Sequence, residues 1–125
     1  MSGRLPLLRA LADPTRLRIV ALVREAELAV GELALVLGQS QPRISRHVRI
    51  LAQAGLVRRQ KEGAWVFLAL GAEPELRALL GALDQWPHDA ATLAADRAAL
   101  GNVRAEREAA ARAWFAAHAE EWDRL

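Results

Sequence analysis

Residues 42–54 form a segment in which apolar and basic side chains separate onto two sides of a predicted helix. At about 100° per residue, one side collects these residues: Ile44, His47, Val48, Leu51 and Ala52. The other side carries Arg43, Arg46, Arg49 and Gln53. Such a helix docks on a core by its apolar side and presents guanidinium groups to solvent. Ile50 lies among the arginines, so we expect a neighbouring element to cover it in part.

The segments around this helix predict a mostly helical fold with a small β-hairpin. Gly38 is a natural end for the preceding helix, and Pro42 is suited to the first turn of the next one. After Gly55, two β-prone runs flank a turn at Glu62-Gly63. Helices are expected over 5–12, 14–26, 32–37, 42–54, 73–86 and 89–123, and strands over 56–61 and 64–70. This order predicts a winged helix-turn-helix.

The helix near residues 14–26 is expected to be the central buried one. Asp13 is a suitable N-cap, and Pro14 follows at the first helical position, where its missing N–H costs nothing. The helix is apolar nearly all round, with Thr15, Arg16 and Arg18 as its polar edge. Residues 28–30 are too few for a helix and could form a minimal strand.

Charge is divided unevenly along the chain. Residues 1–70 hold eleven Arg or Lys against five Asp or Glu, a net charge of +6, whereas residues 71–125 carry −4. Residues 39–61 contain six basic side chains and no acid. A concentrated basic surface is what a polyanion binder needs, because neutralised phosphates release counterions. A solvated basic face without a ligand is the alternative.

Several function classes are disfavoured by composition. The 125 residues include no cysteine and only three histidines, which excludes disulfides, thiolate metal sites and a cysteine nucleophile. No apolar stretch approaches the roughly 18–20 residues of a membrane span, and no secretory leader is recognisable, so we expect a cytoplasmic protein with no membrane partner. Neither a Ser-His-Asp arrangement nor a phosphate-binding loop can be identified, so we expect no enzyme activity from this chain.

The region after Gly71 is acidic and rich in alanine. Its large apolar residues are too sparse for a separate core, so the long helix near 89–123, with a possible break at Gly101-Asn102, is expected to need a partner. That partner could be a second subunit or a missing domain. We therefore predict a winged-helix DNA-binding and dimerisation domain over 1–86 and a C-terminal helical extension over 87–125.

Two stretches resemble the ArsR/SmtB family of repressors. They are residues 11–19 (LADPTRLRI) and residues 41–51 (QPRISRHVRIL), the latter followed by AGLV at 54–57. With the hairpin, the resemblance covers about residues 5–86. It implies a homodimer that binds an imperfect palindromic operator on double-stranded DNA and releases it when an effector binds. Repression, rather than activation, is also implied only by this resemblance.

Carried over position by position, the resemblance and the basic helix together give a set of candidate DNA contacts. On the recognition helix and its start, they are Ser40, Gln41, Arg43, Ser45, Arg46, His47 and Arg49. In the wing, they are Arg58, Arg59 and Lys61. The major groove admits an α-helix, and arginine pairs well with guanine edges. His47 also lies on the apolar side of its helix, so a structural role and a phosphate contact both remain open.

The sequence departs from the family where many members sense metals. Those members carry a Cys-Val-Cys at the start of the helix before the recognition helix, where this chain has Ala29 and Gly31. A second family site uses carboxylates and histidines on the helix after the wing, but residues 71–86 contain no histidine. We therefore expect no metal site and no cofactor. An unknown small-molecule effector, a partner protein or no effector would all fit.

The stretch 107–125 is similar to the lead-in helix of proteins in which an ArsR-like domain is fused to an S-adenosylmethionine-dependent methyltransferase. It could equally be a dimerisation helix with Trp114, Phe115 and Trp122 as packing anchors. Three functions therefore remain: a dimeric repressor, which we favour, the regulatory part of a methyltransferase fusion, and a protein-interaction module that does not bind DNA.

Overall fold

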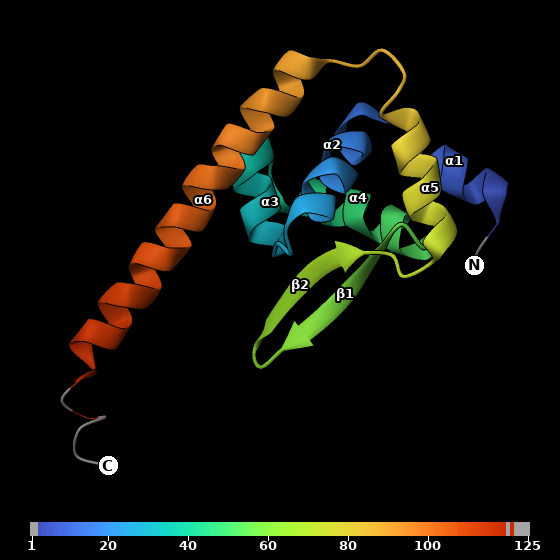
Figure 1. Ribbon diagram of the computed structural model, residues 1–125. Helices are drawn as coiled ribbons and strands as arrows, with labels where there is room; N and C mark the ends of the chain where they lie inside the picture. The colour runs from blue at the N-terminus through green and yellow to red at the C-terminus, as the bar shows by residue number, and fades with distance from the viewer. Residues whose placement is uncertain (1–2, 120, 122–125) are drawn as a thin grey trace.

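The computed structural model describes residues 3–119 and 121, and it is mostly helical with one antiparallel hairpin (Figure 1). The elements are α1 (Arg4–Leu11), α2 (Pro14–Glu25), α3 (Val30–Leu37), α4 (Gln41–Gln53), β1 (Val57–Glu62), β2 (Trp65–Leu70), α5 (Pro74–Leu83) and α6 (Ala90–Ala117). This order confirms the predicted winged helix-turn-helix, with α3 and α4 as its two helices and β1–β2 as the wing.

The ends of the helices follow local capping chemistry. The Asp13 side chain accepts a hydrogen bond from the Arg16 amide at 3.0 Å, which confirms Asp13 as the N-cap of α2. Helix α3 begins at Val30, two residues before the predicted start at Glu32. The cause is the Glu32 carboxylate, which reaches back and accepts a hydrogen bond from the Ala29 amide at 2.9 Å. Gly38 ends α3 in the left-handed conformation, with φ of 65°.

The core forms around α2, as predicted. Its buried side chains include Ile19 and Leu22, which belong to one cluster with Leu33 of α3, Ile44 of α4 and Leu68 of β2. The cluster fixes α4 against α2 through apolar burial, the main stabilising force in a domain of this size.

Leu28 joins the same core and forms an isolated antiparallel bridge with Leu68. The Leu68 amide donates to the Leu28 carbonyl at 2.8 Å. The minimal strand predicted at 28–30 is therefore confirmed only at Leu28, because Ala29 is the N-cap of α3 and Val30 is its first residue.

The wing pairs β1 with β2 from Val57 opposite Leu70 to Glu62 opposite Trp65. Its base is buried, whereas its tip projects from the helices (Figure 1). At the base, a Cβ on Gly71 would overlap the Gly55 carbonyl oxygen, so the close approach of these two chain segments requires glycine.

Helix α6 is continuous through Gly101-Asn102, so the possible break there does not occur. A glycine inside an exposed helix costs only about 1 kcal/mol relative to alanine, and the neighbouring alanines favour the helix. Leu100 anchors the first half of α6 in the core, and the second half extends beyond the rest of the fold (Figure 1). Trp114 and Phe115 remain exposed, and Trp122 lies outside the described residues.

Within the described part of the chain, no helix combines the length and the apolar composition needed to cross a membrane. The division of the chain at residue 86 stays a prediction.

Candidate nucleic-acid interface

Helix α4 is held by its apolar side and exposes its basic side, as its sequence predicts. Ile44, Val48 and Leu51 are each at most 1% exposed. The guanidinium-bearing residues Arg43, Arg46 and Arg49 are exposed to solvent, at successive positions three residues apart. A helix with three exposed cations along one side can neutralise phosphates or contact base edges in a major groove.

The other predicted residues of this helix differ in solvent exposure and in their place along the helix. Ser40 is exposed, and its hydroxyl accepts a hydrogen bond from the Arg43 amide at 3.3 Å, so Ser40 is the N-cap of α4. Gln41 is exposed in the first turn, and Ser45 is half-buried. The exposed first turn of α4 lies at the end of the helix that enters the groove in helix-turn-helix proteins.

Gln39 supports the site, although it was not among the candidate residues of the sequence analysis. Its side-chain nitrogen donates to the buried Thr15 hydroxyl of α2 at 3.2 Å, and its side-chain oxygen accepts from the Arg43 guanidinium at 2.9 Å. Gln39 therefore connects the core helix to the first arginine of α4. Polar residues between two helices have no periodic pattern that would have identified this role.

We expect Gln39→Ala to lower the free energy of unfolding by about 1 kcal/mol, because it leaves the buried Thr15 hydroxyl without its partner. The same change is expected to weaken DNA binding a few-fold, because Arg43 loses its support. Thr15→Val is the matched control, since it removes the hydroxyl but keeps the contact between Gln39 and Arg43. Urea unfolding and DNA titration of both variants check this, and equal losses of DNA affinity would contradict the role of Gln39.

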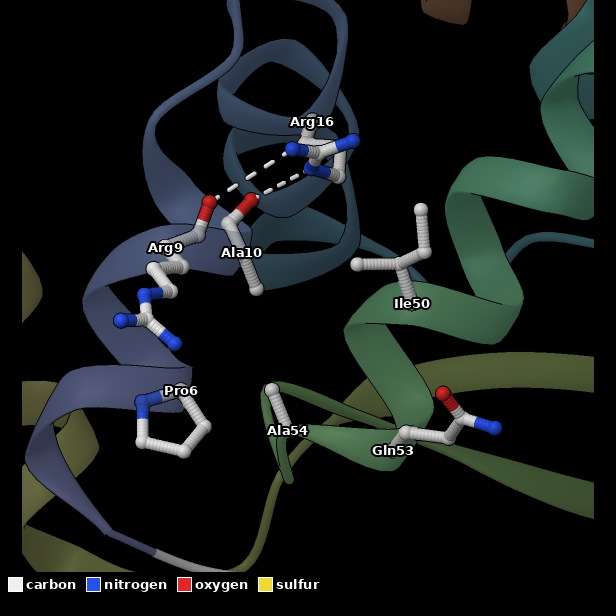
Figure 2. Close-up of a pocket in the computed structure, with 7 residues that line it drawn as sticks. All are labelled: Pro6, Arg9, Ala10, Arg16, Ile50, Gln53 and Ala54. Atoms are coloured by element: carbon white, nitrogen blue, oxygen red, sulfur yellow. Dashed lines mark hydrogen bonds between the residues drawn. The ribbon is translucent and has the colours of Figure 1, made fainter.

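Arg16 joins α1, α2 and α4 at one point. Its guanidinium donates to the Ala10 carbonyl at 2.6 Å and to the Arg9 carbonyl at 3.5 Å, so it satisfies the carbonyl end of α1. These bonds lie beside a cleft of about 590 Å³. Figure 2 shows both bonds, with Ile50 of α4 across from Arg16. Ile50 is still 41% exposed, so α1 and Arg16 cover it only in part, as expected for an apolar residue among arginines.

His47 faces the protein rather than solvent. Its side chain is 14% exposed, its Nδ1 lies 3.3 Å from an Arg16 guanidinium nitrogen, and it lies 4.0 Å from the Asp13 carboxylate. Burial lowers the pKa of His47; the positive charges of Arg16, Arg43 and Arg46 add to this effect, and Asp13 opposes it. A neutral His47 in this position supports the structural role, and its phosphate contact stays a prediction.

For Asp13, local contacts outweigh the effect of burial on the pKa. Burial disfavours its charge, but the hydrogen bond from the Arg16 amide and the positive charge of Arg16 outweigh burial, so the pKa of Asp13 lies below its usual value. Asp13 therefore remains ionised as the cap of α2 beside His47 and Arg16.

The lowered pKa of His47 predicts that the stability of the fold depends on pH. The pKa of His47 is lower in the folded chain than in the unfolded chain. Neutral His47 therefore contributes its full stabilisation above the pKa of the unfolded chain. This contribution is lost as pH falls through the pKa of the folded chain, because the unfolded chain takes up the proton first. We expect the free energy of unfolding to decrease between about pH 7 and about pH 5.5, and to decrease less in His47→Gln. His88→Gln, which changes an exposed ring, is the control. Urea unfolding at both pH values checks this, and parallel losses in all three proteins would contradict it.

The basic residues of the wing lie on two faces. Arg59 and Lys61 are exposed on one face of β1, two residues apart. Arg58 is on the other face, and its guanidinium donates to the Leu70 carbonyl at 3.1 Å, which ties it to the base of the hairpin. Arg59 and Lys61 are therefore the better placed of the three to reach a phosphate.

The tip of the wing carries Trp65, which the sequence interpretation did not include among the site residues. Trp65 is 66% exposed and stacks on Phe67 with 6.4 Å between the ring centroids. Its place directly after the turn at Gly63 could have identified it, because an exposed aromatic at a hairpin tip is seldom needed for packing.

Among residues 3–119 and 121, no three His, Cys, Asp or Glu side chains come together in a group that could hold a metal ion. Ala29 and Gly31, at the start of α3, offer no ligand atoms in their side chains.

Comparison with known proteins gives consistent matches. Residues 13–59 match the family described as "Bacterial regulatory protein, arsR family". The arsenical resistance operon repressor of Escherichia coli (strain K12) is 49% identical over 73 residues, which span 56% of this chain and 62% of the repressor. The chain therefore matches less than two-thirds of that relative's length.

Solved structures show the same architecture. HlyU from Vibrio cholerae N16961 is similar over 64% of this chain and 86% of its own, with 38% identity and a TM-score of 0.58. The homodimeric winged helix-turn-helix DNA-binding domain Mb0332 of Mycobacterium bovis, a possible ArsR-family regulator, covers 63% of this chain and 72% of its own, with 26% identity and a TM-score of 0.59. The cadmium metal-sensor CMTR of Mycobacterium tuberculosis covers 68% of this chain and 96% of its own, with 38% identity and a TM-score of 0.54.

Proposed function

The chain belongs to the arsR family of bacterial regulatory proteins, and from this premise we propose that it represses transcription by binding a palindromic operator as a homodimer. The observation that carries the proposal is the exposed row of Arg43, Arg46 and Arg49 on a helix whose opposite side is fixed in the core. In this arrangement α4 enters the major groove, and Arg59 and Lys61 of the wing contact the flanking backbone.

Exposed apolar side chains on α1 support a homodimer. Leu5 and Leu8 are 57% and 49% exposed, although they belong to a helix that otherwise packs on the core. A second copy would bury them, together with helices that follow residue 72. The homodimeric state of the Mb0332 domain agrees with this interpretation.

We favour an effector other than a metal ion. One similar structure is a cadmium sensor, so membership of the family alone does not decide the effector class. The proposal instead depends on Ala29 and Gly31, which provide no side-chain ligands at the start of α3. The likeness of residues 107–125 to a methyltransferase lead-in remains a prediction, and the proposed activity of this chain is regulatory rather than enzymatic.

The test is binding to the DNA upstream of the chain's own gene, titrated against salt, with a scrambled duplex of equal length as competitor. We expect selective binding, with affinity falling about 10³- to 10⁵-fold between about 50 and 200 mM salt if 6–10 phosphates are contacted. Equal binding to both duplexes by a confirmed dimer, or an affinity indifferent to salt, would contradict the proposed function.

A further inference from the structure

A second cleft, of about 460 Å³, lies away from α4, between α2, the end of α5 and the first turns of α6. Its walls are mainly apolar: Leu17, Val20, Leu80, Leu83, Trp86 and Leu93. Leu17 and Trp86 are 45% and 68% exposed, so large apolar side chains line an open space. Small-molecule sites are typically clefts of this size with mostly apolar walls.

Four charged side chains at this cleft neutralise one another in two pairs. Arg18 of α2 forms two hydrogen bonds with the Asp96 carboxylate of α6, at 2.9 and 2.8 Å. Arg24 forms two with Asp84, just after α5, at 3.1 and 3.0 Å. Both pairs connect different elements across the cleft, so they also hold its walls in place.

The remaining ionisable groups are engaged locally. The His88 ring is hydrogen-bonded to the Trp86 carbonyl at 2.9 Å. Asp89 accepts hydrogen bonds from the Thr92 amide at 3.0 Å and from the Thr92 hydroxyl at 2.5 Å, which caps α6. Every ionisable side chain in the lining therefore has a partner in the same chain. Because both arginines of the lining are already paired with carboxylates, an anionic ligand would lose its hydration without gaining a counter-charge.

We propose that this cleft binds an uncharged, mainly apolar small molecule and that this molecule is the effector of the regulator. The effector role rests on the proposed function, whereas the binding of a ligand does not. Apolar walls favour transfer of such a ligand out of water, and the pairing of both arginines selects against anions.

Helix α6 connects the cleft to the DNA-binding elements. Beyond the cleft, Arg107 of α6 forms a bidentate ion pair with Glu32, the residue that caps α3, and its guanidinium lies 5.6 Å from the centre of the Phe67 ring of the wing. A ligand between α2 and the start of α6 that favours one position of α6 therefore also favours one position of α3 and the wing. By linkage, such a ligand changes DNA affinity to the extent that DNA and the ligand favour different positions of these elements.

The test uses the full chain and the neutral fluorescent dye Nile red as the probe. We expect saturable binding of one dye per chain, weakened at least about tenfold by Ala21→Phe, which fills the cleft, and by Trp86→Ala, which removes an exposed wall. Trp65→Ala is the matched control, because Trp65 is 66% exposed on the wing, and Ala98→Phe is the control for adding a ring to an exposed position of α6. The anionic dye anilinonaphthalene sulfonate is expected to bind at least about tenfold more weakly than Nile red.

Three outcomes would overturn the site: no saturation, equal weakening by the controls, or tighter binding of the anionic dye. A loss of dimerisation in Ala21→Phe or Trp86→Ala, measured by sedimentation, would show that a second copy occupies the cleft and would also overturn it.

A DNA titration separates this inference from the proposed function. Saturating Nile red is expected to change the operator affinity of the unaltered chain at least about fivefold and that of Ala21→Phe not at all. An unchanged affinity with dye bound would overturn the effector role. Failure of the unaltered chain to bind DNA would reject the proposed function, whereas selective DNA binding without dye binding would reject only the cleft.

Discussion

Replacing Arg46 by alanine is expected to weaken binding to specific DNA by about ten- to hundredfold, because a bidentate contact between arginine and a base contributes about 1–3 kcal/mol of discrimination. Arg43→Ala is expected to have an effect in the same range. Both side chains are exposed, so the free energy of unfolding is expected to stay within about 0.5 kcal/mol of its original value. Fluorescence anisotropy with a labelled operator measures the affinity, and urea unfolding measures the stability.

Two further variants show whether these arginines read bases or only attract phosphates. Arg46→Lys keeps the charge but loses the planar fork, so it should retain the salt dependence and lose sequence preference. Arg104→Ala removes an exposed arginine from α6 and is the matched control, with no change expected. If neither Arg43→Ala nor Arg46→Ala alters affinity, α4 is not the recognition helix.

Asp96→Ala is expected to be the most destabilising of the single changes considered for this chain. Asp96 is 4% exposed, and its bidentate bond with Arg18 joins α6 to α2. The same bond raises the pKa of Arg18. An arginine guanidinium keeps its charge even without such a bond, so removing Asp96 leaves a partly buried cation without its partner. Breaking a fully buried pair costs about 3–5 kcal/mol. Because the Arg18 side chain is 30% exposed and water can reach it, we expect a loss of about 2–3 kcal/mol.

The matched control is Asp84→Ala, which breaks the bidentate pair with Arg24. These two side chains are 53% and 32% exposed, and a surface pair contributes at most about 1 kcal/mol. Urea unfolding of the two variants under the same conditions gives the comparison. Equal losses of stability would mean that the pair between Arg18 and Asp96 does not anchor α6.

The elements that the sequence predicted well are those encoded by nearby residues. The sides of α4 follow from the spacing of Ile44, Val48 and Leu51, and the start of α2 follows from Asp13. The possible break at Gly101-Asn102 does not occur, because the helix propensity of the surrounding alanines and the anchoring of Leu100 in the core outweigh the cost of one glycine. The predicted start of α3 at Glu32 is two residues late, because the Glu32 side chain caps the helix rather than beginning it.

The interactions that support the site are between residues far apart in the chain, and sequence patterns do not reveal them. Gln39 reaches Thr15 across 24 positions, and Arg107 reaches Glu32 across 75. Each of these residues is polar and would be assigned to a solvated surface from the sequence alone. Only the packing of α2, α3 and α6 shows that they have partners.

The stretch 13–16 illustrates how a local motif acquires a wider role. Asp13 caps α2, Thr15 supports Gln39, and Arg16 closes the end of α1 and contacts His47. Residues 13–16 therefore position the recognition helix against the core, although they are not part of the exposed row of arginines.

The central claim is that two copies of α4 read a palindromic sequence. Selection of bound duplexes from a random pool, carried out with the unaltered chain and with Arg46→Ala, tests it most directly. We expect the unaltered chain to enrich an inverted repeat whose half-sites are centred about 10–10.5 base pairs apart, or a multiple of that spacing, and Arg46→Ala to lose preference at one position of each half-site. A pool without an enriched repeat, or the same repeat enriched equally by both proteins, would contradict the claim.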